Sequence, residues 1–209
     1  MRAQPISPEL LVERVADAVD RLPRDRRLAV AVDGAPPTGT GELAERLVQA
    51  LRPRGRDAVH VAAGDYLRPA SLRLELGRED PDLFYTEWLD LKAIAREVLG
   101  PIAPGGSGRV LPRLWDAQAD RAYRAQYVEL KPGGVVVLDG SFLLGAGLDY
   151  DLAVHLSMSP AALARHTDAA EAWTLPAYLR YEQEQDPVMT ADIAVRCDHP
   201  AHPALVVRD

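Results

Sequence analysis

The sequence contains a single cysteine and very few lysines. Cys197 is the one cysteine in 209 residues, so the chain cannot form an internal disulfide and nothing indicates an oxidising compartment. Among the 24 lysines and arginines, only Lys92 and Lys131 are lysines. Few residues are therefore available as a phosphate-binding lysine, and the bias toward arginine suggests a GC-rich genome.

Positive charge and long apolar runs are also scarce. The formal net charge of −7 argues against non-specific binding of nucleic acids and against binding to an anionic membrane surface. No run approaches the roughly 18 apolar residues of a membrane span, and the first residues lack the apolar centre of a signal peptide. We therefore expect a soluble, cytoplasmic protein with no nucleic-acid or membrane partner.

The chain does have alternating strand and helix patterns. Apolar, β-branched strand patterns occur at 28–34, 57–65, 135–139 and 151–158, and amphipathic segments lie between them. Such alternation predicts βαβ units in an α/β fold, with a mostly parallel central sheet and helices on both faces. At 47% apolar residues, the sequence can bury a core, and we expect one domain over 1–209.

Two longer helical patterns follow the second predicted strand. Residues 84–100 are predicted to form one helix, and residues 159–187 are predicted to be mostly helical, opened by Ser159 as N-cap and Pro160 in the first turn. His155, inside an apolar strand pattern, is predicted to be a buried histidine with hydrogen-bond partners rather than a catalyst.

Three aspartates lie at or just after predicted strand ends. Asp33, Asp65 and Asp139 each follow an apolar run, and ligands of parallel α/β sheets bind beyond the carboxyl ends of the strands. Aspartates also favour such junctions for structural reasons, so each one alone is weak evidence. Together they indicate a site at this edge of the sheet.

The stretch after the first predicted strand has the outline of a phosphate-binding loop. The pattern G-x-x-x-x-G-K-[ST] finds its glycines at Gly34 and Gly39, but Thr40 and Gly41 stand where lysine and serine or threonine are required. In a working loop, the lysine binds the β- and γ-phosphates and the hydroxyl binds Mg²⁺. The dipeptide 36–37 is Pro-Pro, which removes two backbone donors.

Several motifs carry a resemblance in the right order along nearly the whole chain. They are VAVDG with its loop, GDYLRP, DLFYTEWLDLKAI, PGGSGR, LWDAQADR, VVVLDGSFLL and LVVRD. In this order they resemble the uridine kinase and phosphoribulokinase branch of P-loop kinases, especially short uridine kinase-like proteins of actinobacteria. The resemblance implies a three-layer P-loop NTPase fold with a lid-like segment at about 159–187. It also implies ATP and Mg²⁺ as cofactors and a nucleoside-like ligand.

The resemblance also assigns roles to residues. Asp139 matches the acidic residue that helps hold Mg²⁺, and Arg165 is the one arginine left in the first part of the lid-like segment, residues 159–173. The general base of the family aligns with Gly64, so Asp65 is the catalytic candidate one residue later. The nucleotide-binding candidates are Gly34, Thr38, Gly39, Thr40 and Gly41. The substrate-binding candidates are Asp33, Asp82, Tyr85, Trp115, Asp116, Arg109 and Arg121.

The sequence leaves three hypotheses about function open. The favoured one is a degenerate kinase fold that binds a nucleoside, a nucleotide or a protein partner without phosphoryl transfer, because defects occur together at the lysine, the metal ligand, the base and the lid. The second is an ATP-independent enzyme that uses Asp33, Asp65, Asp116 and Asp139. The third is an active nucleoside kinase in which Arg68, Arg109, Arg113 or Arg121 replaces the lysine. A homodimer is compatible with all three.

Overall fold

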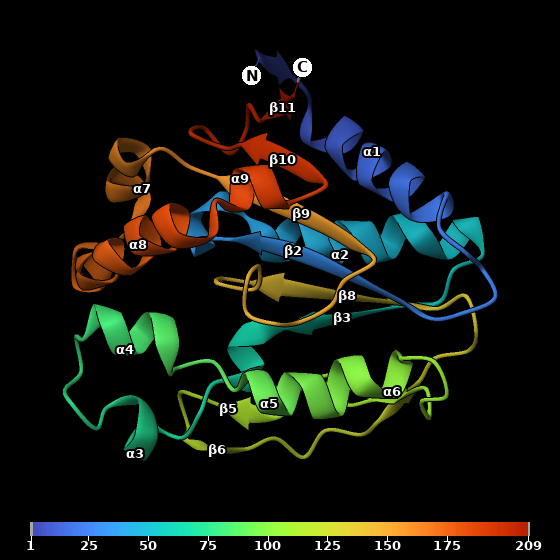
Figure 1. The fold of residues 1–209 in the computed structure, drawn as a ribbon, viewed down its shortest axis with the longest axis horizontal. Coiled ribbons are helices and arrows are strands. Elements are labelled where there is room, and N and C mark those ends of the chain that lie inside the picture. The colour runs from blue at the N-terminus through green and yellow to red at the C-terminus, as the bar shows by residue number, and fades with distance from the viewer. Residues whose placement is uncertain (1, 209) are drawn as a thin grey trace.

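The computed structural model describes residues 2–208, and its centre is a seven-stranded sheet (Figure 1). The strand order is β1-β11-β10-β9-β2-β8-β3. Strands β10, β9, β2, β8 and β3 run parallel, whereas β11 and β1 are antiparallel additions at one edge. The bounds are β1 Arg2–Pro5, β2 Leu28–Gly34, β3 Ala58–Ala62, β8 Val135–Gly140, β9 Leu152–Ser157, β10 Ile193–Arg196 and β11 Ala204–Val207.

One face of the sheet is covered by α1 (Pro8–Asp20) and α2 (Thr40–Leu51). Ser7 caps α1 through its hydroxyl, which accepts from Leu10 N. Side chains along β2 alternate between the two faces: Leu28, Val30 and Val32 join the core below α1 and α2, while Ala29 and Ala31 face the other side. The predicted α/β class, with helices on both faces, is confirmed.

The opposite face carries two groups of helices. The first comprises α5 (Leu91–Ile94), a π-helical turn (Ala95–Leu99) and α6 (Gly100–Ile102). The second comprises α7 (Pro160–His166), a 3-10 segment (Ala169–Thr174), α8 (Leu175–Gln185) and α9 (Pro187–Thr190). No helix within residues 2–208 has the length and apolar character needed to cross a membrane.

Short elements complete the chain. Single-turn 3-10 segments are Pro36–Thr38, Arg52–Arg54 and Ala63–Tyr66, and the short helices are α3 (Ala70–Arg73) and α4 (Pro81–Thr86). Two small hairpin-like pairs, β4 (Arg109–Val110) with β7 (Val128–Glu129) and β5 (Trp115–Asp116) with β6 (Arg121–Ala122), lie outside the main sheet.

The predicted single helix over 84–100 is wrong. It is divided between α4 and α5, because Asp90 leaves the helical conformation and caps a new helix by accepting from Ala93 N at 2.9 Å. The helix predicted from Ser159 also ends early, at His166, and continues as the separate 3-10 segment. At Asp90 the apolar periodicity runs on through a break that side-chain capping creates. After His166 the backbone of Thr167 is extended, and the 3-10 segment begins without a side-chain cap.

Aromatic rings join α4 to α8. Phe84 makes edge-on contacts with Trp88, Phe142, Trp173 and Tyr178, at centroid separations of 5.1 to 5.8 Å. The lid-like segment is therefore packed against the body of the protein.

Candidate functional site

The loop after β2 follows the outline of a phosphate-binding loop. Gly34 lies against β9, where a Cβ would come within 2.7 Å of the Leu156 carbonyl oxygen. Gly39 has a left-handed backbone (φ 83°) and is the N-cap of α2, a conformation that favours glycine. Thr38 donates its hydroxyl to the Ala35 carbonyl at 2.7 Å. Both glycines of the pattern are thus explained by backbone geometry.

The residue in the lysine position of the loop binds an aspartate. Thr40 is 5% exposed and donates its hydroxyl to Asp139 Oδ2 at 3.0 Å. The other oxygen of this carboxylate, Oδ1, lies 2.5 Å from His60 Nε2. This hydrogen bond raises the pKa of His60 and outweighs its partial burial. Asp139 is therefore engaged on both oxygens by neighbouring side chains, and His60 was not identified from the sequence.

The residues present do not fit a bound Mg²⁺–nucleotide. Gly41 supplies no hydroxyl, although a Cβ there would lie 3.5 Å from Asp139 Oδ2 and meet ordinary contact. Thr40 supplies no charge, and each oxygen of Asp139 already makes one hydrogen bond within the protein. The loop thus lacks the positive charge and the hydroxyl ligand that the cofactor needs.

The arginines proposed as substitutes for the lysine are engaged elsewhere. Arg68 pairs with Glu87, Arg113 pairs with Asp65 at 2.7 Å, and Arg109 lies 5.2 Å above the Tyr127 ring. In the part of the chain that is described, none of the candidates Arg68, Arg109, Arg113 and Arg121 lines either cavity beside the loop.

The lid arginine is also directed elsewhere. Arg165 donates to Ala161 O of its own helix at 3.0 Å and is absent from the described lining of both cavities. The arginine that does line the larger cavity is Arg196, at the end of β10.

A second aspartate, Asp33, is fully buried at the end of β2. Its Oδ1 accepts from Leu143 N at 2.9 Å, and its Oδ2 accepts from the Tyr181 hydroxyl at 2.8 Å and lies 2.7 Å from His155 Nδ1. Because the carboxylate is enclosed and has three partners, Asp33 does not contact a ligand directly. The prediction of Asp33 as a substrate-binding residue is corrected in this respect.

His155 links Asp33 to a third charged group. Its Nε2 lies 3.2 Å from Glu182 Oε1. Burial lowers the pKa of His155, but the hydrogen bonds to Asp33 and Glu182 outweigh it and raise the pKa to about 9. His155 is 1% exposed and so is the buried, hydrogen-bonded histidine predicted. At neutral pH it is an imidazolium between two carboxylates.

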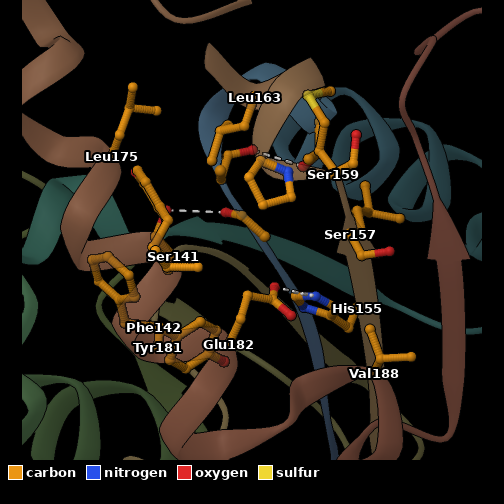
Figure 2. Close-up of a pocket in the computed structure, with 18 of the residues that line it drawn as sticks. Ser141, Phe142, His155, Ser157, Ser159, Leu163, Leu175, Tyr181, Glu182 and Val188 are labelled. Atoms are coloured by element: carbon orange, nitrogen blue, oxygen red, sulfur yellow. Dashed lines mark hydrogen bonds and ion pairs between the residues drawn. The ribbon is translucent and has the colours of Figure 1, made fainter.

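A cavity of about 750 Å³ lies on the β9 side of the loop. Its walls come from the loop, the ends of β8, β9 and β10, and helices α7 and α8. Figure 2 shows His155 and Glu182 pointing toward one another, with the rings of Phe142 and Tyr181 nearby and Leu163 and Leu175 farther up the wall. The volume is typical of small-molecule sites.

A second cavity, of about 390 Å³, lies on the other side of the loop. It is lined by Thr38 and Gly39 of the loop, by Arg46 of α2 and by Cys197 after β10, among others. Arg46 is paired with Glu9 and Glu42. Burial raises the pKa of the Cys197 thiol to about 12, so this thiol is not a reactive thiolate at neutral pH.

The remaining predicted substrate residues do not come together around either cavity. Asp82 is exposed and pairs with Arg180 at 2.8 Å, while Tyr85 packs against Phe142 and accepts from Gln185. Arg121 and Asp116 belong to the β5–β6 pair.

The tryptophan of that pair has a local partner as well. Trp115 donates its ring N–H to Asp120 at 3.2 Å, and Asp116 accepts from Gln118 N and Ala119 N. These contacts give both side chains structural roles within the β5–β6 connection.

The four aspartates of the metal hypothesis also have separate partners. Asp33 contacts His155 and Tyr181, Asp65 contacts Arg113, Asp116 caps its own turn, and Asp139 contacts Thr40 and His60. Across residues 2–208, no group of three or more His, Cys, Asp or Glu side chains is placed to hold a metal ion.

Solved structures share this architecture. A candidate uridine kinase from Bacillus stearothermophilus matches with a TM-score of 0.71 at 19% identity, over 89% of this chain and 98% of that one. The chain has the fold of a P-loop kinase. A candidate fructose transport system kinase from Silicibacter sp. TM1040 matches with a TM-score of 0.60 at 23% identity, over 90% of each chain.

A third structure, that of the YGR205w protein, has a TM-score of 0.57 at 11% identity and covers 96% of this chain and 97% of that one. No family model matches the sequence, and no curated protein matches it either. The resemblance stated from the motifs is thus confirmed at the level of the kinase fold, which leaves the chemistry to the site itself.

Proposed function

We propose that this P-loop kinase fold binds a nucleoside-type ligand in the 750 Å³ cavity without transferring phosphate from ATP. The observation that carries the proposal is the engagement of Asp139, whose two carboxylate oxygens are bound by Thr40 and His60. The residue expected to bind a phosphate instead completes a contact inside the protein. Through Thr40, the loop therefore contacts Asp139 instead of presenting a side chain that binds phosphate.

The size of the expected defect supports the proposal. Phosphoryl transfer depends almost entirely on positioning and electrostatic stabilisation, and removal of one donor to the transition state costs about 100- to 1000-fold in rate. Thr40 and Gly41 together remove the cation and the metal ligand of the pattern. Two such losses correspond to about 5 kcal/mol of barrier or more.

The cavity itself supports small-molecule binding. It combines an apolar wall of Phe142, Leu163 and Leu175 with a charged pair, His155 and Glu182. Apolar walls with a few fixed polar groups are typical of ligand sites. A nucleoside, with a flat base and a hydroxylated sugar, has both kinds of surface.

One observation favours a second candidate, the active nucleoside kinase. Arg196 lines the same cavity as Gly34 and Ala35 of the loop, and within residues 2–208 no ion-pair partner restrains it. An arginine here is a candidate for the missing positive charge. Under this alternative, Mg²⁺-dependent binding of ATP is expected and is lost in Arg196→Ala.

Calorimetric titration separates these functions. The purified chain is titrated with ATP, with and without Mg²⁺, and then with uridine. The proposal expects binding of uridine and no Mg²⁺-dependent binding of ATP. Micromolar, Mg²⁺-dependent binding of ATP supports the active kinase, and no heat with either compound overturns both.

A further inference from the structure

The cavity contains a carboxylate that the kinase chemistry does not use. Glu182, on α8, lines the cavity and keeps 39% of its side chain exposed. Its Oε1 is held by His155 at 3.2 Å, while Oε2 makes no hydrogen bond or ion pair within the described residues. One oxygen is thus fixed and the other is free to accept.

The side chains behind Glu182 fix its position. His155 lies in β9 directly opposite Asp33 of β2 in the parallel register, and it is 1% exposed. The buried carboxylate of Asp33 is itself held by Leu143 N and Tyr181. A chain of contacts thus runs from the centre of the sheet to the cavity wall, and its members have little freedom to move.

The charges of this chain determine what binds at Glu182. Two carboxylates flank one imidazolium, so the local balance is one negative charge when His155 is protonated. A phosphate or carboxylate placed on Glu182 would be repelled, whereas hydroxyl or amine donors would form charge-assisted hydrogen bonds. A carboxylate that accepts from the neighbouring hydroxyls of a ribose is a familiar arrangement in nucleotide sites.

We infer that Glu182, positioned by His155 and Asp33, binds the sugar hydroxyls of the nucleoside-type ligand and makes the cavity selective for an intact ribose. This inference rests on the proposed function. It adds that the selectivity comes from the lid helix α8 and from a carboxylate of this chain outside the loop. The base then lies toward the apolar wall that Phe142, Leu163 and Leu175 form.

The test is a calorimetric cycle with uridine and 2′,3′-dideoxyuridine as probes. The wild-type chain is expected to bind uridine at least tenfold more tightly than the dideoxy analogue. In Glu182→Gln, the loss of charge is expected to weaken uridine about tenfold and to reduce the difference between the two probes to less than about threefold.

A matched control lies one half-turn further along the same helix. Glu184 is exposed, pairs with Arg180 and does not line this cavity. Glu184→Gln is therefore expected to leave both affinities within a factor of two of the wild type. Near-ultraviolet circular dichroism of the two variants checks that the aromatic packing around α8 is kept.

The possible results are distinguishable. If the wild-type chain binds uridine and the dideoxy analogue equally, or if Glu182→Gln weakens both to the same extent, the sugar contact is wrong while the proposed function stands. If neither nucleoside binds the wild-type chain, the proposed function falls, and this inference falls with it.

Discussion

Two histidine–aspartate pairs flank the loop after β2, and they differ in almost every property. His155 and Asp33 join β9 to β2 and are both enclosed, with side chains 2% and 0% exposed. His60 and Asp139 join β3 to β8 and reach solvent, with side chains 24% and 10% exposed. Figure 1 shows these four strands side by side, with β3 at the edge of the sheet.

The difference indicates two uses of the same pair of groups. The enclosed pair has a third partner on each side, Tyr181 and Glu182, and so connects the sheet to the cavity. The exposed pair has Thr40 of the loop as its third partner and so closes the loop onto the sheet. In the proposed function, one pair positions Glu182 on the cavity wall, and the other engages Asp139, the carboxylate that the resemblance assigns to Mg²⁺.

The largest expected effect is a difference in the free energy of unfolding between variants of the two pairs. Asp33→Asn leaves a buried imidazolium without its carboxylate, and we expect the free energy of unfolding to fall by about 3–5 kcal/mol. Asp139→Asn is expected to cost about 1–2 kcal/mol, because water reaches that pair. Urea denaturation followed by tryptophan fluorescence measures both, and a larger loss for Asp139→Asn would reverse the comparison.

The next effect is the dependence of stability on pH. The pKa of His155 is raised to about 9 in the folded chain from an ordinary value of 6.5. The stabilisation from Asp33 and Glu182 is therefore fully present below about pH 6.5 and is lost as the pH rises to about 9, by on the order of 3 kcal/mol.

Two matched variants identify which histidine causes this pH dependence. The pKa of His60 is also raised, so its contribution too is lost as the pH rises above its ordinary value. His155→Gln is expected to flatten most of the slope between pH 6.5 and 9, whereas His60→Gln keeps most of it. Equal slopes in the two variants would mean that the enclosed pair is not charged at neutral pH.

The third effect concerns the loop. Thr40→Lys with Gly41→Ser restores the missing charge and hydroxyl, and His60→Asn in addition frees one oxygen of Asp139. We expect the triple variant to bind MgATP at least tenfold more tightly than the wild type, about 1.4 kcal/mol, and more tightly than the double variant. No gain in either variant would show that more than the loop separates this chain from a kinase.

The smallest expected effect is the loss of the exposed histidine alone. His60→Ala leaves Asp139 bound to Thr40 and accessible to water, so we expect a cost of about 1 kcal/mol in the free energy of unfolding. The same denaturation experiment at pH 7 measures it. A cost equal to that of Asp33→Asn would remove the distinction between the two pairs.

Much of the sheet and the loop could be predicted because their signals are local. The apolar run 28–34 and the glycines at 34 and 39 depend on neighbouring residues, and the structure has the strand and the loop at those positions. The break at Asp90 was missed, because an N-cap inside an apolar periodic pattern is hard to distinguish from a polar residue on a helix face.

The partners within the site could not be predicted, because they depend on strand register. His155 faces Asp33 across 122 residues of sequence, and His60 reaches Asp139 across 79. No spacing rule connects residues so far apart, and a shift of register by one residue would turn each side chain to the other face. Glu182 looks from sequence like any exposed residue of a polar helix.

The aromatic cluster around Phe84 has a consequence for how fast a ligand exchanges. Phe84 of α4 contacts Trp173 and Tyr178 of the lid-like segment, and Asp82 pairs with Arg180. A swing of α8 as a rigid flap would have to separate all these contacts at once. Helix α7 (Pro160–His166) lines the cavity and takes no part in these ring contacts, so we expect entry through local openings of α7, with both association and release slow relative to diffusion.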